Sequence, residues 1–96
     1  MPTYISLIKW TDQGIRNAKA SPDRQRQAMQ RAEQAGGKLT IYVTMGEYDS
    51  VAILEAPDDQ AAMRGLLALG AEGNIRTTTL KALSREEFEQ VVRSLP

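Results

Sequence analysis

The sequence predicts an α+β fold of the ferredoxin-like class, a four-stranded antiparallel sheet with two helices on one of its faces. Segments with two-residue hydrophobic alternation and segments with helical spacing follow one another in the order β-α-β-β-α-β, and a further helix ends the chain. Turn-forming residues mark each boundary between these segments. The length of 96 residues fits one domain, which we expect to span residues 1–96.

The first half of the chain supplies one strand and one long helix. Residues 4–10 alternate aromatic, β-branched and small side chains, which is typical of a strand. Residues 11–14 are turn formers that can start a short helical turn. Ser21 then supplies a predicted N-cap, and Pro22 suits the first helical position. The helix that follows has an apolar face rich in alanine, and the glycines at 36–37 end it.

The second half supplies three strands and two helices. Strands are predicted at residues 38–45 and 50–56, and the short connection through Gly46 makes them antiparallel. A helix with an acidic first turn begins after Pro57, where a proline entry is favourable. A threonine-rich strand follows at residues 74–83.

The last helix has the strongest local signal. Ser84 and Glu87 match a capping box, in which the serine and glutamate side chains each satisfy a backbone N–H of the first turn. Apolar residues then recur at i, i+3, i+4 and i+7, namely Phe88, Val91, Val92 and Leu95.

Composition excludes several classes of function. Lys and Arg total 12, Asp and Glu total 12, and the chain has neither cysteine nor histidine. A neutral chain lacks the basic surplus of a charge-driven nucleic-acid binder. Zinc, haem and iron–sulfur sites, and triads built on histidine, lack their side chains. Asp58 and Asp59 fit a helix start better than a hard-cation site. We therefore expect no metal and no cofactor.

The compartment follows from similar observations. The N-terminal residues have no basic leader before an apolar core, which does not fit a signal peptide. The longest apolar stretch, residues 66–69, is too short to cross a bilayer. We expect a cytoplasmic protein without a membrane segment.

One face of the predicted sheet is left without a cover. The first and third strands, which occupy the middle of a ferredoxin-like sheet, have apolar residues on both faces: Ile5, Leu7, Ile8, Val51, Ile53 and Leu54. An exposed apolar patch of this kind is unusual on a monomer. We therefore expect a homodimer in which two sheets stack as a dimeric α+β barrel. The alternative is that the terminal helix folds back over part of this face.

Aromatic and hydroxyl-bearing residues suggest a ligand site on that open face. Helices bury aliphatic strand faces well, which would leave Tyr4, Trp10, Tyr42 and Thr78 on the other side. Such a mixed lining is typical of pockets for small organic molecules. The alternative is that the rings pack across the dimer, since tyrosine and tryptophan are favoured at interfaces.

The connection at residues 46–49 resembles an active-site loop, yet turn chemistry explains it. Glycine permits a positive φ, and Asp49 can accept hydrogen bonds from nearby amides. Tyr48 can cover the edge of the core while its hydroxyl stays in solvent. We favour the structural interpretation of this segment over a catalytic one.

Glu55, at the end of a central strand, is the remaining catalytic candidate. Half-buried on the open face, it would be a possible general base; the alternative is a surface ion pair with Lys9 or Arg76. Two functions stay open at this point. The first is a module that binds a small organic ligand between sheet layers. The second is a cofactor-independent isomerase or oxygenase using Glu55, Asp49 or Tyr48, against which the absence of histidine counts.

Residues 45–59, with the sequence MGEYDSVAILEAPDD, resemble the signature of the GYD domain family. The family is named for a glycine–tyrosine–aspartate core, and here a glutamate stands between the glycine and the tyrosine. Residues 11–14 and 73–80 are also similar, so the resemblance runs from position 4 to about position 88. It implies a small dimeric α+β barrel protein without an established activity, and it adds no catalytic residue.

Overall fold

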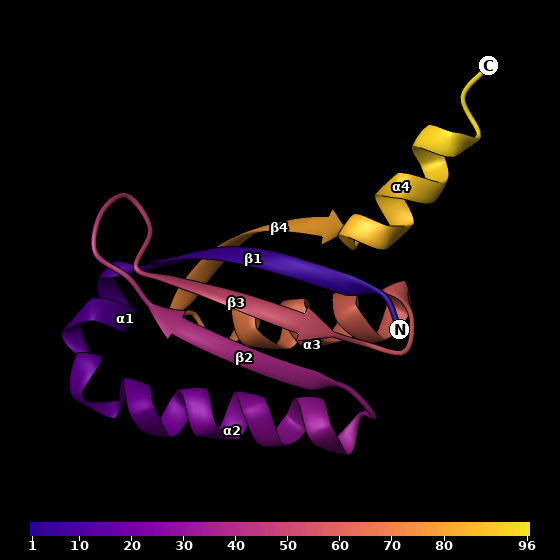
Figure 1. Cartoon of the computed structure of the whole chain (residues 1–96). Helices are drawn as coiled ribbons and strands as arrows, with labels where there is room; N and C mark the ends of the chain where they lie inside the picture. Colours follow the sequence, from indigo (N-terminus) through magenta and orange to yellow (C-terminus); the bar gives the residue numbers. More distant parts are fainter.

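A computed structural model describes all 96 residues and contains one antiparallel sheet with the strand order β2-β3-β1-β4 (Figure 1). The four strands are β1 (Thr3–Trp10), β2 (Lys38–Val43), β3 (Ser50–Glu55) and β4 (Ile75–Ala82). The helices are α1 (Asp12–Arg16), the 3-10 turn η1 (Ala18–Ala20), α2 (Ser21–Gln34), α3 (Asp59–Ala71) and α4 (Arg85–Arg93). The predicted ferredoxin-like order, with the first and third strands in the middle, is confirmed.

The helices α2 and α3 lie on one face of the sheet, which we call the covered face (Figure 1). On β1, the residues of this face are Tyr4, Ser6 and Ile8, and all three are buried. The intervening residues Ile5 and Leu7 point to the opposite side, the open face, and are only half-buried. The two-residue period of the strand thus divides β1 between helices on one side and no cover on the other.

The buried interior of the chain is small. Only 7 of 96 residues are buried, and no large side chain is completely enclosed. The main cluster joins Tyr4, Ala56 and Ala62, with Leu54 and Ala61 packed beside them. Small side chains fill little space between a helix and a sheet, so most of the chain's larger apolar residues keep part of their surface in water.

The start of α2 differs from the prediction. Ala20 occupies the N-cap without a side-chain hydrogen bond, and Ser21 is already helical. The hydroxyl of Ser21 donates instead to the carbonyl of Ala18 at 2.6 Å. The prediction that Ser21 caps the helix is wrong because the 3-10 turn η1 already winds the chain in the helical sense. Pro22 does lie in the first turn, as predicted.

The helices α3 and α4 are each capped at the N-terminus by a polar side chain. Asp58 caps α3 by accepting a hydrogen bond from the Ala61 amide at 2.8 Å. At α4 the predicted capping box is confirmed: the Glu87 amide donates to the Ser84 hydroxyl at 3.0 Å, and the Ser84 amide donates to the Glu87 carboxylate at 2.9 Å. Hydrogen bonding by Ser84, chiefly from its main-chain amide, holds the pKa of the Glu87 carboxyl below its usual value.

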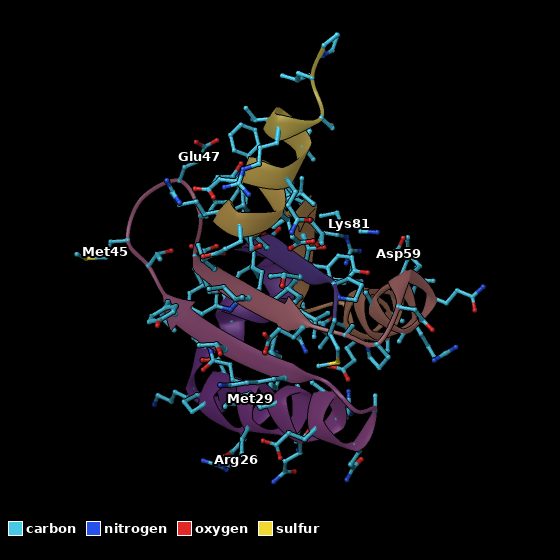
Figure 2. The ribbon with its side chains drawn as sticks, turned by 45° about the vertical axis from the view of Figure 1, so that its right-hand side comes forward. Arg26, Met29, Met45, Glu47, Asp59 and Lys81 are labelled. Atoms are coloured by element: carbon cyan, nitrogen blue, oxygen red, sulfur yellow. The ribbon has the colours of Figure 1, made fainter.

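The helix α4 projects away from α2 and α3 (Figures 1 and 2). The Cα radius of gyration of 14.8 Å exceeds the about 12–13 Å expected for a compact domain of this length. The apolar side chains of α4 stay exposed, with Phe88 at 56% and Val91 at 49%, and Leu95 just after the helix is 64% exposed. The alternative in which the terminal helix folds back over the open face is therefore wrong.

The turn after β1 is tied to the turn before β4. The Thr11 amide donates to the Asn74 carbonyl at 3.0 Å, and the Thr11 hydroxyl donates to the Gly73 carbonyl at 2.5 Å. The Gln13 side-chain amide reaches the Asn74 side chain at 3.0 Å. Gly14 packs so closely here that an added Cβ would lie 1.9 Å from the Asn74 carbonyl oxygen. Only glycine fits at this position without a backbone shift.

We expect Gly14→Ala to lower the free energy of unfolding by about 1–3 kcal/mol, because the new methyl group forces α1 away from the turn before β4. The matched control is Gly65→Ala, inside α3, where an added Cβ meets no neighbouring atom within 4 Å. That variant should gain about 0.5–1 kcal/mol, since alanine favours a helix over glycine. Urea denaturation followed by circular dichroism measures both. A Gly14→Ala protein as stable as the parent would contradict the close packing.

Candidate functional site

The segment 46–49 closes one end of the sheet through main-chain bonds. The Asp49 carboxylate accepts a hydrogen bond from the Trp10 amide at 2.8 Å, and the Asp49 amide donates to the Ile8 carbonyl at 2.8 Å. The Thr44 amide donates to the Asp49 carbonyl at 3.0 Å. Asp49 therefore joins the ends of β1, β2 and β3. These contacts support the structural interpretation of the segment.

Tyr48 lies beside a lysine rather than in a cleft. The ammonium group of Lys9 stands over the Tyr48 ring, 5.2 Å from its centre, and 4.0 Å from the Glu47 carboxylate. The Tyr48 carbonyl accepts a hydrogen bond from the Thr44 hydroxyl at 2.7 Å. Such cation–π and hydrogen-bond contacts fix the loop on the end of β1.

Glu55 lies at the opposite end of β3 from Asp49. The two are six positions apart in the chain, which corresponds to about 20 Å of extended strand. Glu55 is half-buried on the open face, with Lys38 opposite it on β2. It makes no ion pair with Lys9 or Arg76, so the surface pair considered for it is not observed. The three catalytic candidates therefore do not converge on one site.

The four candidate ligand-binding residues are divided between the two faces of the sheet. In the strand register Tyr4 and Trp10 alternate with Ile5 and Leu7, so they lie on the covered face. Tyr42, 60% exposed, and Thr78 lie on the open face. The placement of Tyr4 and Trp10 on the open face is wrong, because alternation defines two faces without deciding which one the helices cover. A ligand-binding role for these residues stays a prediction.

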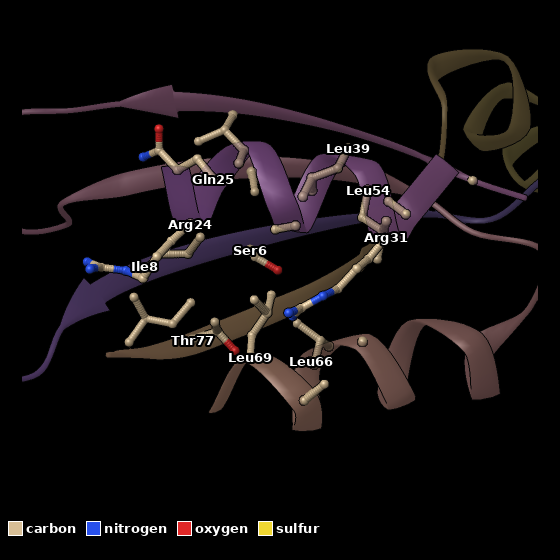
Figure 3. A pocket seen from close by; sticks show the side chains of 18 of the residues that line it. Ser6, Ile8, Arg24, Gln25, Arg31, Leu39, Leu54, Leu66, Leu69 and Thr77 are labelled. Atoms are coloured by element: carbon tan, nitrogen blue, oxygen red, sulfur yellow. The ribbon is translucent and has the colours of Figure 1, made fainter. Parts of the chain in front are cut away.

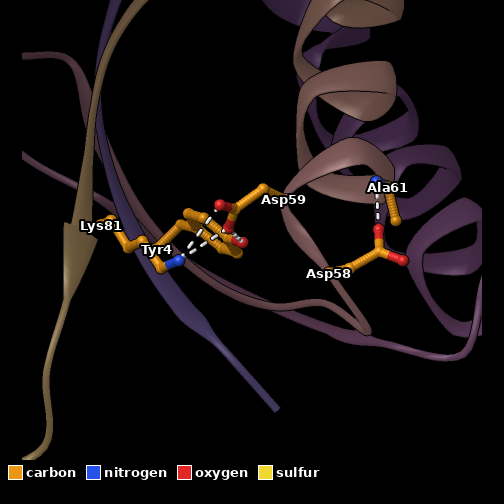
Figure 4. Close-up of polar contacts among 5 residues, drawn as sticks. All are labelled: Tyr4, Asp58, Asp59, Ala61 and Lys81. Atoms are coloured by element: carbon orange, nitrogen blue, oxygen red, sulfur yellow. Dashed lines mark hydrogen bonds and ion pairs between the residues drawn. The ribbon is translucent and has the colours of Figure 1, made fainter.

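Tyr4 belongs to a polar cluster that fastens α3 to the sheet (Figure 4). Its hydroxyl donates to the Asp59 carboxylate, which also pairs with the Lys81 ammonium at 3.0 Å. The hydrogen bond to Asp59, together with burial and the nearby negative charges, raises the pKa of Tyr4 to about 12. Hydrogen bonds from Tyr4 and Lys81 hold the pKa of Asp59 below its usual value. Tyr4 therefore stays a protonated donor that braces the fold.

A cleft of about 340 Å³ lies between α2, α3 and the covered face (Figure 3). Its walls are mostly apolar, with Ile8, Leu39, Leu54, Leu66 and Leu69 among them. Of the four predicted ligand-binding residues, Trp10 lines the cleft, whereas Tyr4, Tyr42 and Thr78 do not. Neither strand alternation nor helical spacing in the sequence predicts this cleft.

One sequence signal could have revealed the cleft. The helix stripe that faces the sheet is built from alanines, and two positions in the middle of the covered face, on β1 and β3, are also small. These residues are Ala28, Ala32, Ala35, Ser6 and Ala52. When both layers present small side chains, the space between them stays unfilled.

The open face carries a band of apolar side chains across three strands. Ile53 lies opposite Ile5 on β1 and Thr40 on β2, and Ile5 in turn lies opposite Leu80 on β4. Ile53 is 38% and Leu80 51% exposed. No other part of the chain covers this band, so the predicted uncovered face is confirmed.

The structure offers no cluster of three or more carboxylate, imidazole or thiol side chains that could hold a metal ion. None of the helices has the length and apolar character needed to cross a membrane.

The comparisons with known proteins identify relatives of this chain. The family described as the GYD domain matches residues 4–92. A protein of Thermus thermophilus, named "Glutamine synthetase and cystathionine beta-lyase binding protein", is 34% identical over 85 residues. The match covers 86% of this chain and 90% of that protein. No solved structure matches the chain significantly.

Asp49 offers a direct test of the structural interpretation. Asp49→Ala removes the acceptor for the half-buried Trp10 amide and should cost about 1–3 kcal/mol of unfolding free energy. Asp49→Asn keeps a side-chain oxygen at the same place and should cost less. Urea denaturation gives both values, and hydrogen exchange at the Trp10 amide should accelerate only in the alanine variant. Equal stability of all three proteins would show that this hydrogen bond does not hold the strands together.

Proposed function

The chain belongs to the GYD domain family, and we propose that it is a non-catalytic homodimer that binds another protein, an enzyme. The observation that carries the proposal is the uncovered apolar band on the open face. The candidate acid–base residues Asp49, Tyr48 and Glu55 lie apart, and two of them have structural partners. The chain therefore presents apolar surfaces suited to binding, whereas its candidate acid–base residues do not converge on one site.

A second copy of the chain is the occupant that fits the open face best. The centre of this face is aliphatic, with Ile5, Leu7 and Ile53, and charged residues such as Lys38 and Glu55 lie toward its ends. An aliphatic centre is self-complementary, as a twofold interface requires. Stacked sheets pack about 10 Å apart and bury both aliphatic faces. Each square ångström of apolar surface removed from water contributes about 25 cal/mol.

The helix α4 is a second uncovered apolar surface and supports the binding of a different protein. Its exposed stripe consists of Phe88, Val91 and Val92, and Leu95 extends it just beyond the end of the helix. An amphipathic helix of this kind typically docks in an apolar groove of its partner. The Thermus relative is named for binding glutamine synthetase and cystathionine beta-lyase. We propose that α4 is the part of this chain that contacts an enzyme of that kind.

The dimer is tested by the mass in solution. Light scattering coupled to size exclusion should give twice 10.6 kDa for the parent protein at micromolar concentration. Ile53→Lys places a charge in the centre of the stacked sheets and should give a monomer with an unchanged far-ultraviolet spectrum. The control is Met45→Lys, a fully exposed residue of the loop between β2 and β3 (Figure 2), which should remain a dimer. A monomeric parent protein would overturn this part of the proposal.

Enzyme binding is tested separately, with glutamine synthetase and cystathionine beta-lyase purified from the organism that encodes this chain. Biolayer interferometry should show saturable binding to at least one of them. The double variant Phe88→Ser, Val92→Ser should lower that affinity at least about tenfold. Met63→Ser, which removes an exposed apolar side chain from α3, is the control and should bind like the parent. Binding to neither enzyme, or binding that ignores the α4 substitutions, would contradict the proposed contact.

A further inference from the structure

We propose that the cleft between α2 and α3 binds a small carboxylic acid with an apolar body. This site lies on the covered face, on the opposite side of the sheet from the proposed dimer interface. It therefore does not depend on the proposed function.

The apolar character of the ligand follows from the residues that form the walls of the cleft. Leu39, Leu54 and Ile8 form the sheet side, and Leu66 and Leu69 form the wall on α3 (Figure 3). Small-molecule sites typically have volumes of about 300–1,000 Å³ and apolar linings. These apolar side chains are in contact with water when the cleft is empty. An apolar ligand that displaces this water is therefore bound favourably.

The volume limits the size of that body. At roughly 30 Å³ for each water-sized unit, the 340 Å³ cleft holds about ten heavy atoms. A medium-chain aliphatic acid or a small aromatic acid has this size. Larger lipids would leave much of their chain outside the cleft.

The charge of the ligand follows from three arginines that line the cleft, Arg24, Arg31 and Arg64. Arg31 reaches from α2 toward α3 and pairs with the Glu72 carboxylate at 2.8 Å (Figure 3). Arg24 donates only to main-chain carbonyls, those of Asn17 at 2.9 Å and Gly14 at 3.5 Å. Arg64 forms no ion pair. Two guanidinium groups thus lack a carboxylate partner.

The lining acids do not cancel this positive charge. Glu72 is already neutralised by Arg31. Glu55 lies between the covered-face positions of β3, so its side chain belongs to the open face, while its carbonyl packs against Gly37 at the edge of the cleft. A guanidinium group binds a carboxylate through two parallel hydrogen bonds. An apolar cleft with two unpaired arginines therefore favours an apolar monocarboxylate over a neutral or cationic molecule.

The binding test uses decanoate as the probe, with 1-decanol and acetate for comparison. Trp10 lines the cleft and is the only tryptophan, so its fluorescence reports occupancy. Decanoate below its micellar concentration should give a saturable change. The alcohol, which lacks the charge, should bind at least about tenfold more weakly. Acetate, which lacks the apolar body, should produce no change. Absence of saturable decanoate binding, or equal affinity for decanol, would overturn the proposal.

Variants then locate the site. Arg24 lies near the start of α2 and Arg64 in the first half of α3, so the single carboxylate of decanoate identifies its partner by the variant that weakens binding. At least one of Arg64→Gln and Arg24→Gln should lower decanoate affinity about tenfold, and no loss in either would overturn the proposal. The control is Arg26→Gln on the same helix as Arg24, because Arg26 points away from the sheet and pairs with Asp23 at 2.8 Å (Figure 2). Equal losses in all three variants would indicate general screening and overturn the proposal.

Filling the cleft gives an independent measurement. Ala28→Leu extends an aliphatic side chain into the space and should abolish decanoate binding while raising the melting temperature. If that variant does not fold, the arginine variants decide the question by themselves. The helix α4 of another copy is the competing occupant. Decanoate binding that appears only in the Phe88→Ser, Val92→Ser variant would show that α4 fills the cleft, and the proposal would be wrong.

Discussion

The constraint on which the structure depends is that the two central strands are apolar on both faces. Ile5 and Leu7 on one side of β1, and Ile8 on the other, all need cover. The chain provides cover on one side only, with two helices. Full burial of one large aliphatic side chain contributes about 1.5–3 kcal/mol to stability. The uncovered band therefore leaves a large part of the possible hydrophobic stabilisation unused in the monomer. The chain has no further element that packs on the second face of the sheet. The open face, the exposed α4 and the proposed dimer all reflect this.

Polar contacts hold the strands at their two ends. At one end Asp49 binds the Trp10 amide, and the turn at Thr11 binds the turn before β4. At the other end Tyr4 and Lys81 meet Asp59 at the start of α3. The residues that carry the family resemblance contribute to both ends, with Asp49 bound to the main chain of β1 and Asp59 bound to the Tyr4 and Lys81 side chains. These residues fix the positions of the strands at their ends. The middle of the sheet is then available for binding partners on either face.

Patterns along the sequence predicted those features that depend on near neighbours. The sequence order of strands and helices, the antiparallel connection at residues 46–49 and the capping box of Ser84 each follow from short-range chemistry. The pattern failed where a choice depends on distant elements. Strand alternation could not tell that α2 and α3 cover the side of Tyr4 and Trp10. Ser21 lost its expected cap because the preceding 3-10 turn changes the entry geometry. The cleft was missed because it depends on the combined sizes of side chains from two layers.

The distribution of polar groups supports the proposed binding role over catalysis. General acid–base work needs groups that converge within hydrogen-bond reach of one reacting atom. Asp49, just before β3, and Glu55, at its end, stand about 20 Å apart, and Asp59 is held by Tyr4 and Lys81. What remains free is apolar surface on both faces, with unpaired arginines beside the cleft. Because the cleft and the open face use opposite sides of β1 and β3, a small acid and a second copy can be bound at the same time. One thin sheet can thus serve two kinds of partner without direct competition between them.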